Sequence, residues 1–457
     1  MNISSFKRII IIILFLTANR VSGQYAGTYT VGGSSPNFKT LTDAFTALKT
    51  SGISGNVRLN VRSGAYTERI GISGISGASN SAIIRIAPDP NNTSPVIIKN
   101  SLTSLSTNFI FEAKQGYFEF DSIQFKVESN SKYGRIFDFN GNLENVTFDG
   151  CTFYGRDTSS EHDYFAILYD GFNDSVDNYK ILNCNFHFGS FAIYHFGHNS
   201  IYEKGFDVIN SNFYNYYYHS IYTYYQKSPS IQGNYSIDKN KDVTANGMRF
   251  YDCDSLRLTG NRIYLSRGET ALHIERCDGS AQKPVIISNN IICVYDSSKS
   301  DATSIGLKIV NGAYVSICFN TIYNCNKDNS SIAFHFYGTS GTIAKNNNII
   351  KRKSGYAVKF INSANNTCDY NNYYSEGSYI GNYSTSYFKD LSAIKSFTGL
   401  DKNSISHNML FRSYTDLRTN SKYLDSAGTP ISGIEKAEKE IKRKDIAPIK
   451  PTKTVIN

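Results

Sequence analysis

The chain repeats one short pattern, in which a small residue is followed by alternating apolar positions. Most copies begin 24 to 28 residues apart, and one interval of 35 leaves room for a longer loop. Alternation with a period of two predicts a β-strand in each copy. The copies are FAILYD from 165, FAIYHF from 191, HSIYTYY from 219, NGMRFYD from 246, TALHIER from 270, IGLKIVN from 305, IAFHFYG from 332 and YAVKFIN from 356. A chain of this kind is expected to form one repetitive solenoid.

A second motif follows most copies, with an apolar run, an asparagine and another apolar pair. Asparagine tolerates left-handed turns, so its recurrence predicts a bend in each coil where the side chains stack as a hydrogen-bonded ladder. The recurring positions are Asn185, Asn212, Asn261, Asn290, Asn320 and Asn348. The 34 Tyr, 29 Phe and only nine Pro also favour many short strands. Three strands with turns in 22 to 35 residues predict one rung of a parallel β-helix.

The combined pattern, GxxhxhxxxxxxxhxIxxNxI, resembles the right-handed parallel β-helix of the pectin-lyase-like superfamily, as found in secreted bacterial proteins. The start of the chain resembles the entry of such proteins, with a short helix in LTDAFTALK and then a V-x-x-G-x-Y-x-E strand and turn. The resemblance implies an all-β solenoid with an N-terminal capping helix, for which we expect about ten rungs. It leaves activity open, because the superfamily includes lyases, hydrolases, epimerases and non-catalytic surface proteins.

Three segments are expected along the chain. Residues 1–23 resemble a signal peptide, because Lys7 and Arg8 precede an apolar stretch too short to span a bilayer. Residues 24–430 form the β-helix with its cap, and residues 431–457 form a charged, flexible tail. The formal charge falls from +9 to +6 without the signal, which carries Lys7, Arg8 and Arg20. We therefore expect a secreted or cell-surface protein without a transmembrane segment and without a nucleic-acid partner.

Stacking the copies predicts which side chains point inward. The expected core column is Ile167, Ile193, Ile221, Met248, Leu272, Leu307, Phe334 and Val358. The next position points outward and contains Leu168, Tyr194, Tyr222, Arg249, His273, Lys308, His335 and Lys359. Two residues further, the same face carries Asp170, Phe196, Tyr224, Tyr251, Glu275, Val310, Tyr337 and Ile361. Rungs stack about 4.8 Å apart, so these residues would line one face that is aromatic at one end and basic at the other.

Such a face suits an extended polysaccharide. Aromatic rings stack on sugars, and Arg, Lys and His pair with uronate or sulfate groups, so an acidic glycan is the sharpest expectation. The expected carbohydrate-binding residues are Tyr194, Tyr222, Tyr224, Tyr251, Tyr337 and Lys359. Two alternatives stay open. Exposed strand positions are often filled by these residue types without any ligand, and a non-catalytic surface or adhesive β-helix protein would present the same face to a host or matrix partner.

If the protein is an enzyme, a polysaccharide lyase is a better match than a glycoside hydrolase. β-Elimination needs a base and a cation that stabilises the developing negative charge. The candidate catalytic residues are Arg249, His273, Lys308, His335 and Glu275. Hydrolysis needs facing carboxylates, whereas Glu275 is the single acid in the middle of this face. For the same reason we expect no metal site, and no motif predicts a cofactor.

Three smaller expectations concern single residues. His195 falls on an inward position and is expected to be a hydrogen-bonded core residue. Arg276 is expected to turn away from His273 and Glu275. Cys253 and Cys277 occupy equivalent positions on neighbouring rungs, which allows either a disulfide or a stack of buried thiols.

Overall fold

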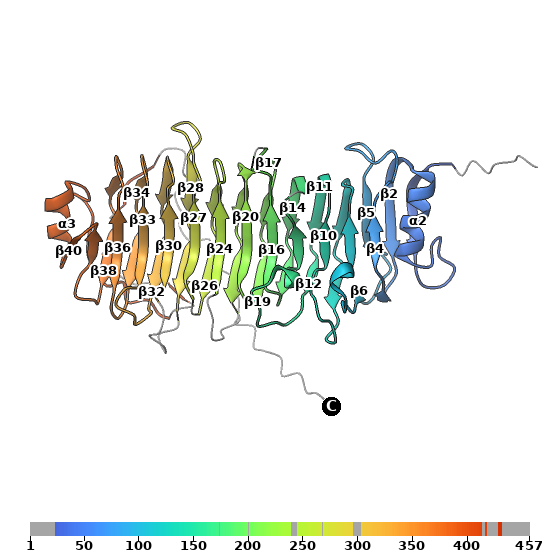
Figure 1. The fold of residues 1–457 in the computed structure, drawn as a ribbon, viewed down its shortest axis with the longest axis horizontal. Helices are drawn as coiled ribbons and strands as arrows, with labels where there is room; N and C mark the ends of the chain where they lie inside the picture. Colours follow the sequence, from blue (N-terminus) through green and yellow to red (C-terminus); the bar gives the residue numbers. More distant parts are fainter. Residues whose placement is uncertain are drawn as a thin grey trace, which may run out of the picture.

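The protein is an elongated solenoid of short strands in the computed structural model (Figure 1). The structure describes residues 23–172, 174–199, 201–238, 245–266, 268–295, 303–413, 416–417 and 428–431. Successive strands pass through three long sheets in turn, here called sheets A, B and C, and each strand pairs in parallel with the one a rung earlier. This topology confirms the right-handed parallel β-helix that the repeat predicts.

Sheet A runs along the whole solenoid. Its strands are β1 (Tyr25–Val31), β2 (Ile53–Val61), β5 (Ile84–Pro88), β8 (Phe118–Asp121), β11 (Asn142–Asp149), β14 (Ser175–Leu182), β18 (Asp207–Ile209), β22 (Ser230–Gln232), β25 (Arg257–Thr259), β28 (Val285–Ser288), β31 (Val315–Cys318), β34 (Ile343–Lys345) and β37 (Thr367–Asp369).

Sheet B follows sheet A in each coil. Its strands are β3 (Gly64–Thr67), β6 (Val96–Asn100), β9 (Gln124–Val127), β12 (Thr152–Tyr154), β15 (Asn185–His187), β19 (Asn212–Tyr216), β23 (Tyr235–Asp238), β26 (Arg262–Leu265), β29 (Ile291–Val294), β32 (Thr321–Asn324), β35 (Asn348–Lys351) and β38 (Asn372–Ser375).

Sheet C completes each coil and contains the copies of the sequence repeat. Its strands are β4 (Ile70–Ile72), β7 (Phe111–Ala113), β10 (Phe137–Phe139), β13 (Leu168–Asp170), β16 (Phe191–Phe196), β20 (His219–Tyr224), β24 (Asn246–Tyr251), β27 (Thr270–Glu275), β30 (Ile305–Val310), β33 (Ile332–Tyr337), β36 (Tyr356–Ile361), β39 (Gly381–Tyr383) and the antiparallel β40 (Ser386–Phe388). A separate pair, β17 (Glu203–Lys204) and β21 (Gln226–Lys227), lies in loops.

The solenoid has about 13 turns within the described residues, so the expectation of about ten rungs is wrong. The repeat becomes regular only from residue 165, whereas sheet C already contains β4, β7 and β10 before that point. These early strands are only three residues long. Their alternation is too short to stand out in the sequence.

Helices close both ends of the described solenoid (Figure 1). The predicted capping helix is confirmed as α2 (Leu41–Ser51), whose first turn is fixed by a capping box between Thr40 and Asp43. At the other end lies α3 (Leu391–Thr398), capped by Asp390, which the sequence pattern did not predict. Two 3-10 turns, Leu105–Thr107 and Asp163–Phe165, lie between strands. No helix of the described residues is both long enough and apolar enough to cross a membrane.

The core column predicted from the repeat is correct from β16 onward. Ile193, Ile221, Met248, Leu272, Leu307, Phe334 and Val358 pair rung to rung, and each has at most 1% of its surface exposed. The first member is buried in the core as predicted, but it does not belong to the paired column. Leu168, not Ile167, pairs with Ile193, so Leu168 and Asp170 lie inside and Tyr169 points outward. The 3-10 turn that ends at Phe165 delays the start of β13, and a slip of one residue exchanges the two faces of a strand.

The asparagine ladder exists, although half of its predicted members are misplaced. Buried amides pass hydrogen bonds of 2.9 or 3.0 Å from rung to rung through Asn234, Asn261, Asn290, Asn320, Asn347 and Asn371. We call this set the internal asparagine ladder. The other three predicted residues lie one position later and form separate pairs, Asn212 with Asn185 at 3.0 Å and Asn372 with Asn348 at 2.8 Å.

All eight cysteines are buried, and none of them forms a disulfide. Cys253 and Cys277 do stack on neighbouring rungs, and the Cys253 N–H donates to Cys277 Sγ at 3.3 Å. The stack of thiols is therefore the arrangement present, in place of a disulfide. Residues 1–22 of the expected signal and residues 432–457 of the expected tail lie outside the described residues, so both segment boundaries stay predictions.

Candidate functional site

The two outward columns of sheet C are continuous and in register from β16 to β36. The central ladder is Tyr194, Tyr222, Arg249, His273, Lys308, His335 and Lys359. The flanking ladder is Phe196, Tyr224, Tyr251, Glu275, Val310, Tyr337 and Ile361. Each predicted binding or catalytic residue therefore lies on one face, at the position that the repeat assigns to it. Whether these residues bind or react stays a prediction.

The aromatic half of the face forms a continuous stack. Tyr169 stacks on Tyr194 with ring centroids 5.1 Å apart. In the flanking ladder, Phe196 stacks on Tyr224 at 4.3 Å and Tyr224 on Tyr251 at 4.4 Å. The hydroxyls of Tyr222 and Tyr224 lie 2.9 Å apart and share a hydrogen bond. The rings thus support one another as a fixed platform instead of moving independently.

The basic half begins where the aromatic half ends. The Arg249 guanidinium lies 4.6 Å above the Tyr251 ring, so a cation–π contact joins the two halves. His273, Lys308 and His335 follow on the next three rungs. Among the described residues, Lys308 and Lys359 form no hydrogen bond or ion pair, and buried nitrogens of Arg249, His273 and His335 have no hydrogen-bond partner. The face therefore presents unpaired donors in a row.

Burial on this face is deeper than an outward direction suggests. His273 is 4% exposed, Tyr251 6% and His335 9%, whereas Tyr337 at the far end is 39% exposed. Outward-pointing side chains shield one another when their rings stack along a flat sheet. An anion seated here would meet donors that water solvates poorly, which strengthens charge-assisted hydrogen bonds.

Glu275 is held by Arg276, contrary to the expectation that Arg276 turns away. The Arg276 guanidinium donates to Glu275 Oε1 at 2.8 Å and binds both carboxylate oxygens of Asp252 at 2.8 Å. Arg276 adopts a left-handed φ of 50°, and this bend carries its side chain back over the Tyr251 ring. Glu275 Oε2 lies 3.4 Å from His273 Nε2 without hydrogen-bond geometry. The acid of the face is thus engaged by Arg276, which it shares with Asp252.

The two histidines of the central ladder are neutral at ordinary pH. Burial and the positive charges of Lys308 and Arg249 lower the pKa of His273 to about 2. Burial, Lys359 and Lys308 lower the pKa of His335 to about 4. Burial also lowers the pKa of Lys308, although Glu275 opposes the shift. A bound anion would offset these effects and raise all three pKa values.

We expect the rings of His273 and His335 to remain neutral at pH 5, where an unperturbed histidine is mostly protonated. Titration of the imidazole nitrogens by NMR, with His273→Gln and His335→Gln to assign the signals, measures this directly. Because the folded pKa values are lowered, the unfolded chain binds more protons below about pH 6.5, and both residues reduce stability as the pH falls. Midpoints near 6.5 would contradict the described burial.

His219 belongs to the same neighbourhood and was not predicted. It pairs with Phe191 three positions before the central ladder and stacks on that ring at 5.4 Å. It is fully buried, neither ring nitrogen has a hydrogen-bond partner, and burial with the charges of Arg249 and His273 lowers its pKa well below the usual value. Strand alternation assigns His219 to the inward side with Ile221, so the repeat could not have identified this position.

The expectation for His195 is confirmed, because the ring lies inside the coil with Nδ1 2.7 Å from Asp170 Oδ2. Asp170, His195 and Glu203 form the one cluster of three possible metal-binding side chains in the described part of the chain. This cluster lies on the inner side of β13 and β16, away from the ladders. On the ladder face itself, the described residues offer no such group.

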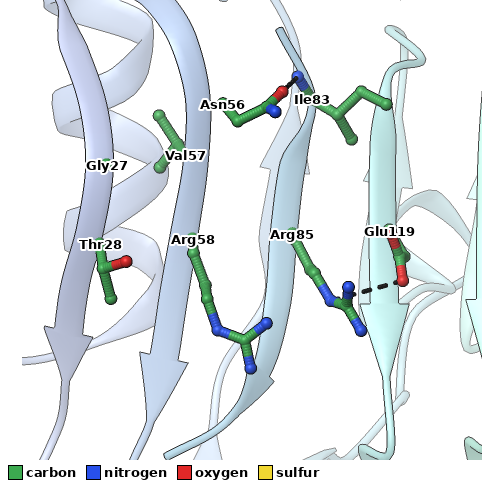
Figure 2. A pocket seen from close by; sticks show the side chains of 8 residues that line it. All are labelled: Gly27, Thr28, Asn56, Val57, Arg58, Ile83, Arg85 and Glu119. Carbon is green, nitrogen blue, oxygen red and sulfur yellow. Dashed lines mark hydrogen bonds and ion pairs between the residues drawn. The ribbon is translucent and has the colours of Figure 1, made fainter.

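A hollow of about 340 Å³ lies elsewhere, on sheet A near the N-terminal end (Figure 2). Arg58, Arg85 and Glu119 line it. Arg85 is paired with Glu119 at 3.4 Å and with Asp121 at 2.5 Å, so its charge is balanced within the protein. The ladder face differs because its cations have no such partners.

The strand topology defines the chain as a parallel β-helix protein. No family model matches it, and no curated protein matches its sequence. Solved structures with a similar coil include a GH136 lacto-N-biosidase from Eubacterium ramulus, at 11% identity over 83% of this chain and 71% of that chain with a TM-score of 0.44.

Two further structures share the coil. The A-module of a mannuronan C-5 epimerase from Azotobacter vinelandii covers 80% of this chain and 94% of its own, at 11% identity and a TM-score of 0.40. The match to a rhamnogalacturonan lyase covers 84% of this chain and 87% of the lyase chain, at 11% identity and a TM-score of 0.34. At these identities and TM-scores, the activities of the three proteins say nothing about this chain, and its function must be argued from its own residues.

Proposed function

We propose that the protein binds an extended, anionic polysaccharide along the outer face of sheet C. The observation that carries the proposal is the pair of in-register ladders, in which a rigid aromatic stack passes directly into a row of unpaired cationic and imidazole groups. Sugar rings would pack against the exposed edges and hydroxyls of Tyr194, Tyr222 and Tyr224, because the faces of Tyr194 and Tyr224 are stacked on neighbouring rings. Carboxylate or sulfate groups would accept hydrogen bonds from Arg249 and Lys308.

The charge balance of the face favours an anionic ligand over a neutral one. Glu275 is engaged by Arg276, and no other acid lies in the two ladders. A buried donor without an acceptor destabilises the protein, and a ligand that accepts a hydrogen bond from it removes that cost. A polymer with an anionic group on each sugar would supply acceptors at intervals similar to the rung spacing, and one with an anionic group on every second sugar would supply them at about every second rung. We also propose that residues 1–23 direct the chain out of the cell, where such polymers occur.

Cleavage by β-elimination is the second candidate function, favoured by the position of Lys308. This amine lies between two neutral imidazoles, and burial lowers its pKa, which favours the neutral form that can act as a base. The base would take the proton α to a uronate carboxyl, a C=C bond would form, and the adjacent glycosidic C–O bond would break. Arg249 would stabilise the carboxylate as negative charge develops, and a tyrosine hydroxyl such as that of Tyr251 would protonate the leaving oxygen.

A glycan panel tests both functions. The protein is incubated with polygalacturonate, alginate, chondroitin sulfate and hyaluronan, with neutral dextran as the matched control, and binding is measured by affinity electrophoresis. Absorbance of the unsaturated product reports cleavage. We expect retardation by at least one anionic glycan and none by dextran. Absence of binding to every anionic glycan would overturn the proposal and favour an adhesive role for this face.

A further inference from the structure

A buried polar cluster lies beneath the aromatic half of the ladders. Asp170 on β13 and His195 on β16 pair directly across adjacent rungs, and Glu203 on β17 reaches in from the loop that follows β16. The three side chains are at most 2% exposed. His195 lies between Tyr194 and Phe196, so the cluster supports the rung that carries two platform rings.

The charges of this cluster are not balanced by any basic side chain other than His195. His195 Nδ1 lies 2.7 Å from Asp170 Oδ2, and Nε2 lies 3.0 Å from Glu203 Oε2. In the described part of the chain, no Lys or Arg forms an ion pair with either carboxylate. Two carboxylates and one imidazole therefore carry a net negative charge in an interior without water contact, which is costly unless a cation or protons neutralise it.

Several oxygen atoms at the cluster also lack partners. Gln226 donates through Nε2 to Glu203 Oε2 at 2.9 Å, yet its own Oε1 has no hydrogen bond. Thr223 follows His195 in the same inward column, and its hydroxyl is also unpaired. Asp170 Oδ1 and the hydroxyl of Tyr179, whose ring packs on His195 at 5.3 Å, complete the set. All four side chains are at least 98% buried, and unsatisfied buried oxygens of this number are rare in native proteins.

We propose that Asp170, His195 and Glu203 bind one divalent transition-metal ion, with Zn²⁺ as the best match. Two carboxylates and a neutral imidazole give a neutral complex with a divalent ion. A mixed nitrogen and oxygen donor set with an imidazole favours Zn²⁺ over Mg²⁺ or Ca²⁺, which prefer oxygen alone. The possible ligand atoms already lie within 4.8 Å of one another. Bonds of about 2.1 Å to a tetrahedral ion would bring ligand atoms to about 3.4 Å, so Asp170, which lies at His195 Nδ1, would turn toward an ion held by His195 Nε2 and Glu203.

Gln226 Oε1 is the fourth ligand available within the cluster, since its amide is already anchored on Glu203. The ion would join β13, β16 and β17, so it would act as a structural staple and not as a reaction centre. It would fix the loop strand β17, which supplies Glu203, to the interior of the solenoid. The proposal does not depend on the glycan-binding function, because the cluster faces away from the ladders.

A cluster held together by protons is the competing state. Burial raises the pKa of Asp170 to about 8, so in the absence of metal this carboxyl keeps its proton at neutral pH. A protonated Asp170 beside an imidazolium and the Glu203 carboxylate would also be neutral overall. The two states differ in metal content, which makes them distinguishable by direct measurement.

Elemental analysis of the full chain, purified without chelators and again after dialysis against EDTA and Zn²⁺, tests the proposal. We expect about one equivalent of metal per chain after Zn²⁺ loading. At free Zn²⁺ a hundredfold above Kd, the melting temperature should rise by about 3 °C over the metal-free protein. No stoichiometric uptake by the folded protein, together with an unchanged melting temperature, would overturn the proposal in favour of the proton-held cluster.

Glu203→Gln and His195→Gln should abolish both the bound equivalent and the Zn²⁺-dependent rise in melting temperature. His219→Gln is the matched control, because His219 is an equally buried histidine with unpaired nitrogens but without a carboxylate partner. This variant should retain the bound metal. Loss of metal in His219→Gln but not in Glu203→Gln would place the ion elsewhere and overturn the assignment. If a variant fails to fold, the metal content of the unaltered chain still decides the question.

Discussion

Replacing Arg249 and Lys308 together with methionine is expected to lower the affinity for an anionic polysaccharide by about 100-fold. Each side chain would donate a charge-assisted hydrogen bond in a half-buried setting, and such bonds contribute about 1.5 to 3 kcal/mol each. Loss of two at the lower limit corresponds to about 3 kcal/mol, or a factor of somewhat more than 100 in Kd. Methionine preserves length and apolar contact, so the aromatic platform should remain. Isothermal titration calorimetry with a uronate oligosaccharide measures the change.

Arg262→Met with Lys345→Met is the matched control for this variant. These residues lie on outward positions of sheets B and A, away from the ladder face, and the double change removes the same charge. Affinity should fall less than about threefold, since only the long-range attraction of the protein is altered. Equal losses of affinity in both double variants would mean that the net charge of the protein, and not the ladder, governs binding, and would contradict the assignment of the site.

The ladder face could be predicted from the sequence because its strands obey strict alternation. From β16 to β36 each copy has the same length, so a single alignment placed Arg249, His273 and Lys308 in register across neighbouring rungs. Whether a side chain points outward follows from its odd or even position in the strand. How deeply it is buried does not, since the burial of His273 arises from neighbouring rings and not from its own strand.

Irregular positions were mispredicted for identifiable physical reasons. A 3-10 turn displaced β13 by one residue, which moved Asp170 from the expected outer face into the interior beside His195. Glu203 comes from a loop strand outside the repeat, so no periodicity could bring it to the same cluster. The left-handed backbone at Arg276 likewise redirects a side chain in a way that strand alternation does not encode.

The recurring asparagine correctly predicts a hydrogen-bonded ladder, but the sequence alone can assign the ladder to the wrong residue. Consecutive asparagines, as in Asn289 with Asn290 or Asn347 with Asn348, make the frame ambiguous by one residue. The internal ladder uses the residue that points inward, which only the strand register defines. The same inward position holds Cys184 and Ser211 in earlier coils, so the ladder begins at Asn234 although the bend exists before it.

Asn290→Ala is expected to destabilise the centre of the solenoid by about 3 to 4 kcal/mol. The Asn290 side chain is 1% exposed, accepts from both the N–H and the amide of Asn261, and donates to the Leu258 carbonyl and to Asn320 Oδ1, with distances of 2.9 or 3.0 Å. Alanine removes all four bonds and leaves donors of Asn261 without an acceptor. Each buried group that loses its partner costs about 1 to 3 kcal/mol.

Water could enter the space vacated in Asn290→Ala and restore some of these bonds, because the lining is polar. Asn290→Leu fills that space with apolar atoms, so it should be at least as destabilising as the alanine variant even though it leaves no cavity. Asn212→Ala is the control, since this residue belongs to the outer pair and loses one partly exposed bond to Asn185, at a cost below about 1 kcal/mol. Guanidinium unfolding with hydrogen exchange at the flanking turns measures all three changes and locates them along the coil. Equal costs for Asn290 and Asn212 would mean that stacking strands, and not the internal ladder, stabilise the bend.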